Sequence, residues 1–344
     1  MNPKQQNTLH QLLKEHTIEL HNKVHRIPYI SNLKKNDIQI ISYVGHLRAL
    51  AIIYGTLENQ FSMIENQEIK NFLENYSPRL PLILADLENL NANKTKDIIP
   101  AVNIALQLAD NVLINSISNP YKLLGFIYTL EVSLIGGEML NNHISETFNF
   151  QNDNAINYLS AINEDFTIFW DSFLSKINTN IIDNQQKDDV ISASNEIFYD
   201  LIKIYESLYP IDEMKLGNHI TSINPEAGNF PIPTNPLEIK AAITAANYCW
   251  NEFPYYKKRF GERGRRFAAS DTVWLVSLCE LTDEETINQV NWLANFLAMR
   301  GMPTYLMETQ MQLLYHELSK LIPLNEPKYL KLFKTSEYIT SVRL

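Results

Sequence analysis

Apolar residues recur at spacings of three and four along almost the whole chain, and runs of strict apolar and polar alternation are scarce. Such spacing places the apolar side chains on one face of a helix. The pattern therefore predicts an all-α protein. The helices expected in its first part lie near residues 7–26, 36–64, 67–75, 79–90, 99–115, 120–147, 154–178 and 187–208.

The helical pattern changes character between Tyr209 and Pro236. This segment holds five prolines and two glycines in 28 residues, and proline cannot continue a helix. It therefore predicts a linker, residues 209–236, between a helical domain of residues 1–208 and a smaller helical domain of residues 237–344.

Helix ends in the second domain carry recognisable cues. Ser270 precedes an apolar run and is a candidate N-cap, while Thr282 and Glu285 form a capping-box pattern. The helix that this box opens is expected to end at about Met299. Two more helices are expected, near 304–322 and from about 327.

The most unusual stretch is the apolar run from Leu123 to Leu140, LLGFIYTLEVSLIGGEML, which holds three of the chain's ten glycines. A glycine inside a helix costs about 1 kcal/mol relative to alanine. Gly125, Gly136 and Gly137 therefore indicate that something approaches this helix closely. A crossing helix and a flat ligand are the two explanations.

Composition narrows the classes of function. The net charge of -10 and the pI near 5.3 oppose a nucleic-acid partner, which needs a clustered positive field. Two cysteines without a CxxC motif fit a reducing compartment and are expected to be buried. The start of the chain lacks a signal-peptide pattern, and Glu131 and Glu138 interrupt the apolar run. We therefore expect a cytoplasmic protein with no membrane partner.

The first helix carries a stripe of candidate ligands. A step of about 100° per residue places Lys14, Thr17, His21 and His25 on one side of it, with His16 on the other. A neutral imidazole can bind a metal ion or haem iron. His21 alone fits a structural histidine as well as a ligand, and its pairing with His25 at i, i+4 also fits a different metal site.

Four segments resemble the haem oxygenase family, particularly its bacterial members partnered with phytochromes. Thr17 and His21 match the family's Thr-x3-His element, and Tyr43 to Glu58 is similar to its helix of spaced tyrosines and leucines. The run YTLEVSLIGGEML is similar to the family's distal-helix signature, and Val190 to Leu208 resembles its final core helix. Their order and spacing agree over about residues 7–208.

The resemblance implies oxidative opening of haem to biliverdin, carbon monoxide and iron, with O2 and an external electron donor of the reductase or ferredoxin type. It implies that His21 is the axial ligand of the haem iron and that Phe198 lies near the haem. Ser133, Gly136 and Gly137 would form the catalytic distal wall. The residues expected to contact haem further include Thr17, Val132, and Lys14 and Lys176 as partners of its carboxylates.

The chain departs from the family pattern in places. Val132 stands where the family has glycine, so a branched side chain is expected to protrude toward the distal side. His25 stands where an acidic residue is common, and Lys176 is the only basic residue in its helix. These departures leave a second hypothesis open: a haem, tetrapyrrole or small-ligand binding or regulatory protein without turnover. For Ser133, a hydroxyl bond to its own helix is the alternative to a catalytic role.

A third hypothesis is a di-iron oxidase on the same scaffold. Its candidate ligands are Glu131, Glu138 and His143, with Glu58 facing His21 or His25. Helical geometry turns both glutamates of the apolar run away from the Gly136 and Gly137 face, and His143 lies about 140° from Glu138. The expected ligands therefore do not converge.

The second domain contains no catalytic motif that we identify. Its basic segment, residues 257–266 within YYKKRFGERGRRF, fits a solvated loop or arginines that bridge to the acidic first domain. Alternatively, the segment fits a binding site for nucleic acid, an anionic cofactor or an acidic partner surface. A homodimer through this domain is a further hypothesis.

Overall fold

The structure, a computed structural model, describes residues 7–92, 95–138, 140–148, 150, 156–217, 233, 235–298, 302 and 304–343. The described residues are almost entirely helical, which confirms the all-α prediction. The chain divides into two compact units, Met1–Asn218 and His219–Leu344, called unit 1 and unit 2 below. The division falls inside the predicted linker, of which residues 218–232 and 234 lie outside the described part.

Unit 1 contains helices at nearly all the positions that the periodicity predicts. Their bounds are α1 Leu9–Val24, α2 Pro28–Leu33, α3 Ile40–Met63, α4 Gln67–Phe72, α5 Leu80–Asn89, α6 Ile99–Ser118, α7 Lys122–Glu138, α8 Asn141–Phe148, α9 Glu164–Asn180 and α10 Asn184–Leu208. The helix expected over 120–147 is thus two helices, α7 and α8, with Leu140 in a turn before α8.

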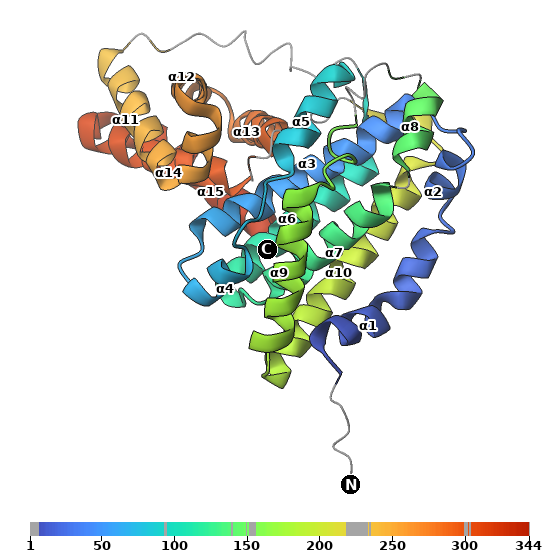
Figure 1. Cartoon of the computed structure of the whole chain (residues 1–344). Coiled ribbons are helices and arrows are strands. Elements are labelled where there is room, and N and C mark those ends of the chain that lie inside the picture. The colour runs from blue at the N-terminus through green and yellow to red at the C-terminus, as the bar shows by residue number, and fades with distance from the viewer. Residues whose placement is uncertain are drawn as a thin grey trace. The chain divides into compact units, whose positions relative to one another are not determined.

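Four long helices, α3, α6, α7 and α10, run side by side through unit 1 (Figure 1). Their facing residues are buried, and α3 is apolar on nearly every side. Within the described residues, α3 is also the one helix long and apolar enough to cross a membrane, over Ile40–Ser62, yet 89% of that window is buried inside the structure. Burial of this kind is what a central core helix shows.

Helices α7 and α10 approach each other closely at Gly125. A Cβ atom at this position would lie 2.2 Å from the carbonyl oxygen of Val190 and 2.9 Å from the backbone nitrogen of Ser194, both on α10. One turn later, the Thr129 hydroxyl lies 2.6 Å from the Ser194 hydroxyl. The crossing-helix explanation is therefore confirmed for this glycine.

A short strand pair joins the end of unit 1 to its middle. Strand β1, Asp97–Ile98, pairs antiparallel with β2, Leu216–Gly217, which follows the 3-10 helix η2, Glu213–Lys215. Beside it, the fully buried Arg48 of α3 forms an ion pair with Asp97 at 2.9 Å. The first residues of the predicted linker are thereby part of unit 1.

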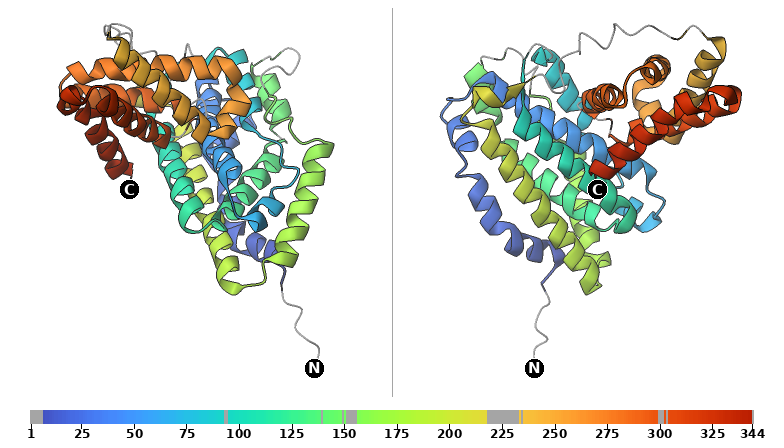
Figure 2. Two further views of the ribbon diagram at one scale, coloured as in Figure 1. Left: turned by 90° about the vertical axis from the view of Figure 1, so that its left-hand side faces the viewer. Right: turned by 180° about the vertical axis from the view of Figure 1, so that it is seen from behind.

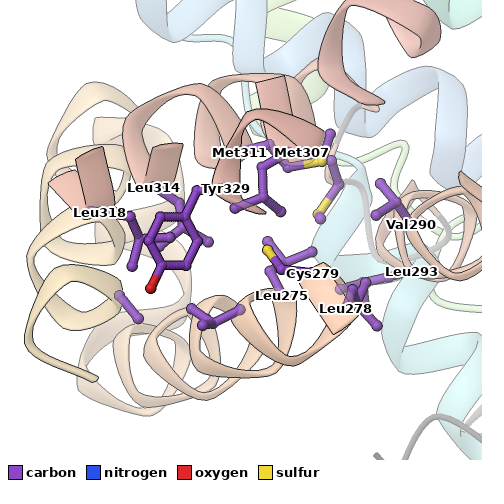
Figure 3. Close-up of a cluster of buried hydrophobic side chains, with 14 of the residues drawn as sticks. Leu275, Leu278, Cys279, Val290, Leu293, Met307, Met311, Leu314, Leu318 and Tyr329 are labelled. Carbon is purple, nitrogen blue, oxygen red and sulfur yellow. The ribbon is translucent and has the colours of Figure 1, made fainter. Parts of the chain in front are cut away.

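Unit 2 is a second helical unit with a core of its own. Its elements are α11 Pro236–Glu252, α12 Pro254–Ser277, η3 Leu278–Glu280, α13 Asp283–Ala298, α14 Tyr305–Leu321, η4 Pro323–Asn325 and α15 Glu326–Arg343. Figure 3 shows the core, in which Leu275, Cys279, Met311 and Tyr329 point toward one another from α12, η3, α14 and α15. Both cysteines of the chain are free and buried, as expected, and burial raises the pKa of each thiol to about 12.

The helix-end predictions in unit 2 have different outcomes. The capping box is confirmed, because the backbone nitrogen of Thr282 donates to the Glu285 carboxylate at 2.9 Å and the backbone nitrogen of Glu285 donates to the Thr282 hydroxyl at 3.3 Å. Ser270 as an N-cap is wrong. Helix α12 continues through Ser270, because its apolar side chains pack on both sides of this position: Tyr256 and Phe260 in one buried cluster before it, and Leu275 in the core of Figure 3 after it.

The basic segment of unit 2 lies inside α12 and is not an interhelical loop. The helix breaks at Gly261, whose φ of 55° is accessible to glycine at little cost. Lys257 and Lys258 are exposed, whereas Arg259 lies over the Phe260 ring at 5.0 Å and donates to the Tyr255 hydroxyl at 3.0 Å. The side chains of residues 262, 263, 266 and 267 lie outside the described part.

Two glycines of α7 provide a matched test of the α7–α10 contact. We expect Gly125→Ala to lower the free energy of unfolding by ~3 kcal/mol, because the methyl group would meet backbone atoms that cannot rotate away. Gly136→Ala should raise the free energy of unfolding by about 1 kcal/mol, because a Cβ atom there meets none of the described residues within 4 Å. Urea unfolding followed by circular dichroism measures both, and equal effects of the two substitutions would contradict the close contact.

Candidate functional site

Helices α1 and α7 both pack against α10 and touch each other near their starts. The His10 ring on α1 meets the Tyr128 ring on α7 edge to face, with centroids 5.8 Å apart. The backbone nitrogen of His10 also donates to Asn178 of α9 at 2.9 Å. Figure 2, right, shows α1 lying along the outer side of α10. This is the first junction between the two helices.

A second junction closes the other end. Helix α2, which follows α1, packs against α8, which follows α7. Asn36, just after α2, accepts from the Thr147 hydroxyl at 3.1 Å and donates to Glu146 at 3.4 Å. Helices α1, α2, α8 and α7 therefore form a closed circuit with α10 behind it. His21 lies on one arm of this circuit and Gly136 on the other, each between the two junctions.

The α1 arm presents the histidine stripe that the sequence indicated. Thr17 is buried and donates to its own helix at Leu13 O, at 2.8 Å. One turn later, the His21 ring is partly exposed and stands edge to face with His25, with centroids 4.8 Å apart. Partial burial lowers the pKa of His25, and His21 and Lys34 add to this shift. Lys14 is exposed on the same stripe.

The α7 arm changes from buried to partly exposed within the circuit. All side chains from Leu123 to Glu131 are buried, whereas Val132, Ser133 and Gly136 are partly exposed. Open space lies beside the Gly136 backbone, while a Cβ atom at Gly137 would approach Leu159 Cδ2 to 3.1 Å. The glycine pair thus has one open side and one packed side.

Two other predicted contact residues lie on α10 and α9. Phe198 is buried on α10, the helix behind the circuit. Lys176 on α9 forms an ion pair with Glu74 at 2.7 Å and donates to the Asn71 carbonyl at 2.7 Å. Its ammonium group is therefore held at α4. Lys14, the other predicted partner of the haem carboxylates, forms no ion pair with the residues that the structure describes.

The acidic residues of the di-iron hypothesis are engaged in structural contacts. Glu58 accepts from the backbone nitrogens of Arg79 and Leu80, at 2.5 and 3.1 Å, and Glu131 forms a buried ion pair with Arg79 at 2.9 Å. The prediction that Glu58 faces His21 or His25 is therefore wrong, because its carboxylate binds the backbone nitrogens at the start of α5. Across the described residues, no group of three or more His, Cys, Asp or Glu side chains could hold a metal ion, and the Glu138 side chain lies outside them.

Two buried residues near α7 were missed by sequence reasoning. Arg79 ties α5 to α7 through Glu131, and Asp86 of α5 accepts hydrogen bonds from the backbone nitrogens of Asn157 and Tyr158. Asp86 had a signal in the sequence, since it is a lone acid within the apolar run LPLILADL, and a buried carboxylate needs partners. Arg79 had none, because its partner is 52 residues away along the chain.

The sequence of unit 1 matches the model of a known protein family. The model of the family described as Heme oxygenase matches residues 7–207, which is more than half of the chain and nearly all of unit 1. The chain belongs to the haem oxygenase family. Unit 2 lies outside the match, and a comparison with curated proteins found no relative.

Solved haem oxygenase structures share the fold of unit 1. Heme oxygenase from Leptospira interrogans has a TM-score of 0.51 and 17% identity, and the match covers 58% of this chain and 99% of that one. Heme oxygenase-1 from the cyanobacterium Synechocystis sp. PCC6803, in complex with heme, has a TM-score of 0.50 and 17% identity, with 59% and 93% covered. At this identity the likeness shows the haem oxygenase fold.

A buried aromatic trio lies under the α2 end of the circuit. The Tyr29 hydroxyl is 3.2 Å from His46 Nδ1, and the Tyr205 ring of α10 stands edge to face with His46, with centroids 5.1 Å apart. Burial lowers the pKa of His46 to about 4. The imidazole is therefore neutral in the folded protein at physiological pH.

Acid should weaken unit 1 through His46. In the unfolded chain its pKa is near 6.5, so between pH 6.5 and pH 4 only the unfolded state gains this proton, and stability falls as the pH falls. His46→Gln, which cannot titrate, should remove about 3 kcal/mol of this pH dependence. Urea unfolding from pH 7 to pH 4 measures it. His16→Gln, at an exposed position on α1, is the control, and parallel profiles for wild type and His46→Gln would contradict the assignment.

Proposed function

We propose that unit 1 binds haem between α1 and α7, with His21 as the axial ligand of its iron, and opens it oxidatively to biliverdin, carbon monoxide and iron. The observation that carries the proposal is the placement of His21 and Gly136 on opposite arms of the α1, α2, α8 and α7 circuit. Membership of the haem oxygenase family supports it. The neighbour from Synechocystis sp. PCC6803 is itself a complex with heme.

The chemistry of the two arms fits a flat substrate with a central iron. A neutral imidazole is a ligand for haem iron, and the His21 ring is accessible on its arm. The opposite face of a haem needs backbone at close range, and Gly136 has open space where another residue would carry a side chain. Lys14, on the same stripe as His21, would pair with a haem carboxylate.

Each residue then has a distinct role in the proposed reaction. Haem supplies the iron that activates O2, and an external donor of the reductase or ferredoxin type, in the cytoplasm, supplies electrons. His21 holds the substrate in place, and the α7 backbone at Gly136 restricts the space on the other face. The Ser133 hydroxyl, partly exposed on the same arm, donates a hydrogen bond and passes a proton on that face.

A hemin titration tests the binding step. Wild-type protein should develop the absorbance spectrum of histidine-ligated haem with one equivalent of hemin, and His21→Ala should lose it, because the axial nitrogen is gone. His16→Ala, on the other side of the same helix, is the matched control and should bind as wild type does. With a reductant and O2, the wild-type complex should then convert to a bilin. Unchanged spectra in His21→Ala would refute the assigned ligand.

One observation favours a second candidate function, haem binding without turnover. Val132 is partly exposed on the α7 arm, one turn before Gly136, so its branched side chain occupies space on the proposed distal side. A site narrowed there would hold haem while leaving little room for O2.

Val132→Gly separates the two functions. Removing the side chain should raise hemin affinity by about tenfold, or ~1.4 kcal/mol, if the valine crowds the site. It should also allow conversion to a bilin if wild type holds haem unchanged. The control is Val132→Ala, which shortens the side chain without the helix-propensity cost of glycine, and should give an intermediate effect. Equal affinity in all three proteins would show that Val132 does not crowd the haem.

A further inference from the structure

A short segment outside the proposed haem contacts, Ile156 to Ala161, is anchored to α5 by one carboxylate. Asp86 is fully buried and accepts three hydrogen bonds from this segment. They come from the Asn157 backbone at 2.8 Å, the Asn157 side chain at 2.7 Å and the Tyr158 backbone at 2.9 Å. Hydrogen bonds to a carboxylate are about twice as strong as neutral ones, so Asp86 fixes the position of the segment.

The anchored segment touches both sides of the break between α7 and α8. Leu159, buried in it, is the residue that a Cβ atom at Gly137 would approach to 3.1 Å. The next residue, Ser160, accepts a hydrogen bond from Asn141 at the start of α8, at 2.8 Å. The segment thus lies against the packed side of the glycine pair, while the Gly136 side is open.

The end of α7 needs such a support. Two successive glycines lower its helix propensity by about 2 kcal/mol relative to alanine, and the helix ends one residue later, at Glu138. The last turns of a helix fray most readily, because their carbonyl groups lack partners within the helix. A helix end of this kind keeps one orientation only when neighbouring residues hold it.

We propose that Asp86 is a positioning residue for the α7 wall: through Leu159 it holds Gly137 from behind and keeps the Gly136 backbone turned toward the haem site. This inference rests on the proposed function for its consequence on haem. Its structural part, the support of α7 by the Asp86 carboxylate, concerns the protein without haem and is tested separately.

Hydrogen exchange in the haem-free full chain tests the support. Asp86→Asn replaces an acceptor by an amide that turns an NH2 group toward one backbone N–H, so the segment loses a hydrogen bond. We expect the amides of residues 134–138 to exchange about ten- to a hundredfold faster in this variant. Leu159→Ala, which leaves Asp86 and its hydrogen bonds intact, should give the same local increase.

Asp97→Asn is the matched control. Asp97 is as deeply buried as Asp86 but pairs with Arg48 of α3, so the substitution destabilises unit 1 without touching the anchored segment. In Asp97→Asn, amide hydrogen exchange should become faster throughout unit 1 and not selectively over residues 134–138. Selectively faster amide exchange at residues 134–138 in both Asp86→Asn and Leu159→Ala would confirm that Asp86 holds the end of α7. Unchanged exchange at these residues in both variants would overturn that role.

Hemin titration of a double-mutant cycle tests the consequence for haem. Gly137→Ala should weaken hemin binding several-fold, because the methyl group pushes against Leu159 and turns the α7 backbone. Adding Leu159→Ala should restore binding to within about twofold of Leu159→Ala alone. Additive losses would overturn the positioning role. If wild type itself fails to bind hemin, the proposed function fails, and the exchange experiment alone decides on Asp86.

Discussion

Unit 1 depends on the contact between α7 and α10 at Gly125, where the two backbones leave no room for a single methyl group. Side chains between helices normally keep their axes about 8–10 Å apart, and a glycine at the crossing removes that spacer. The Thr129 and Ser194 hydroxyls, 2.6 Å apart, hold the same crossing one turn later. These two contacts hold the first half of α7 against α10.

The contact matters for the candidate site because α10 also carries α1. The Lys23 ammonium near the end of α1 lies 3.1 Å from Glu206, and Lys122 at the start of α7 lies 3.1 Å from Glu196. These exposed or half-exposed ion pairs contribute little stability, but they show that α1 and α7 both attach to α10. A ligand held between His21 and Gly136 is therefore held by two helices whose separation α10 determines. From the side of α5, Arg79 and Asp86 add the buried charges that hold α7 and its neighbouring segment.

The sequence predicted the elements of this arrangement better than their contacts. Periodicity located the long helices because burial of one apolar face decides where a helix forms, and that face is visible in the spacing of residues. Glu58 and Glu131 show the limit of such reasoning. Both are acids on core helices, which suits metal ligands and structural partners equally, and their partners at Arg79 and Leu80 are remote in the sequence. The Ser270 prediction failed for a related reason: a residue type suited to an N-cap also occurs within a helix when apolar side chains before and after it are packed.

The three glycines of α7 show how one residue type answers to different constraints within a single helix. At Gly125 a side chain is excluded by backbone and at Gly137 it is restricted by the side chain of Leu159, whereas at Gly136 no described residue lies within 4 Å of an added Cβ atom. An alanine at Gly136 would favour the helix by about 1 kcal/mol, so packing against the described residues does not account for this glycine. A crossing helix thus accounts for Gly125 and a neighbouring side chain for Gly137, and of the two explanations offered for these glycines the flat ligand stays a prediction for Gly136.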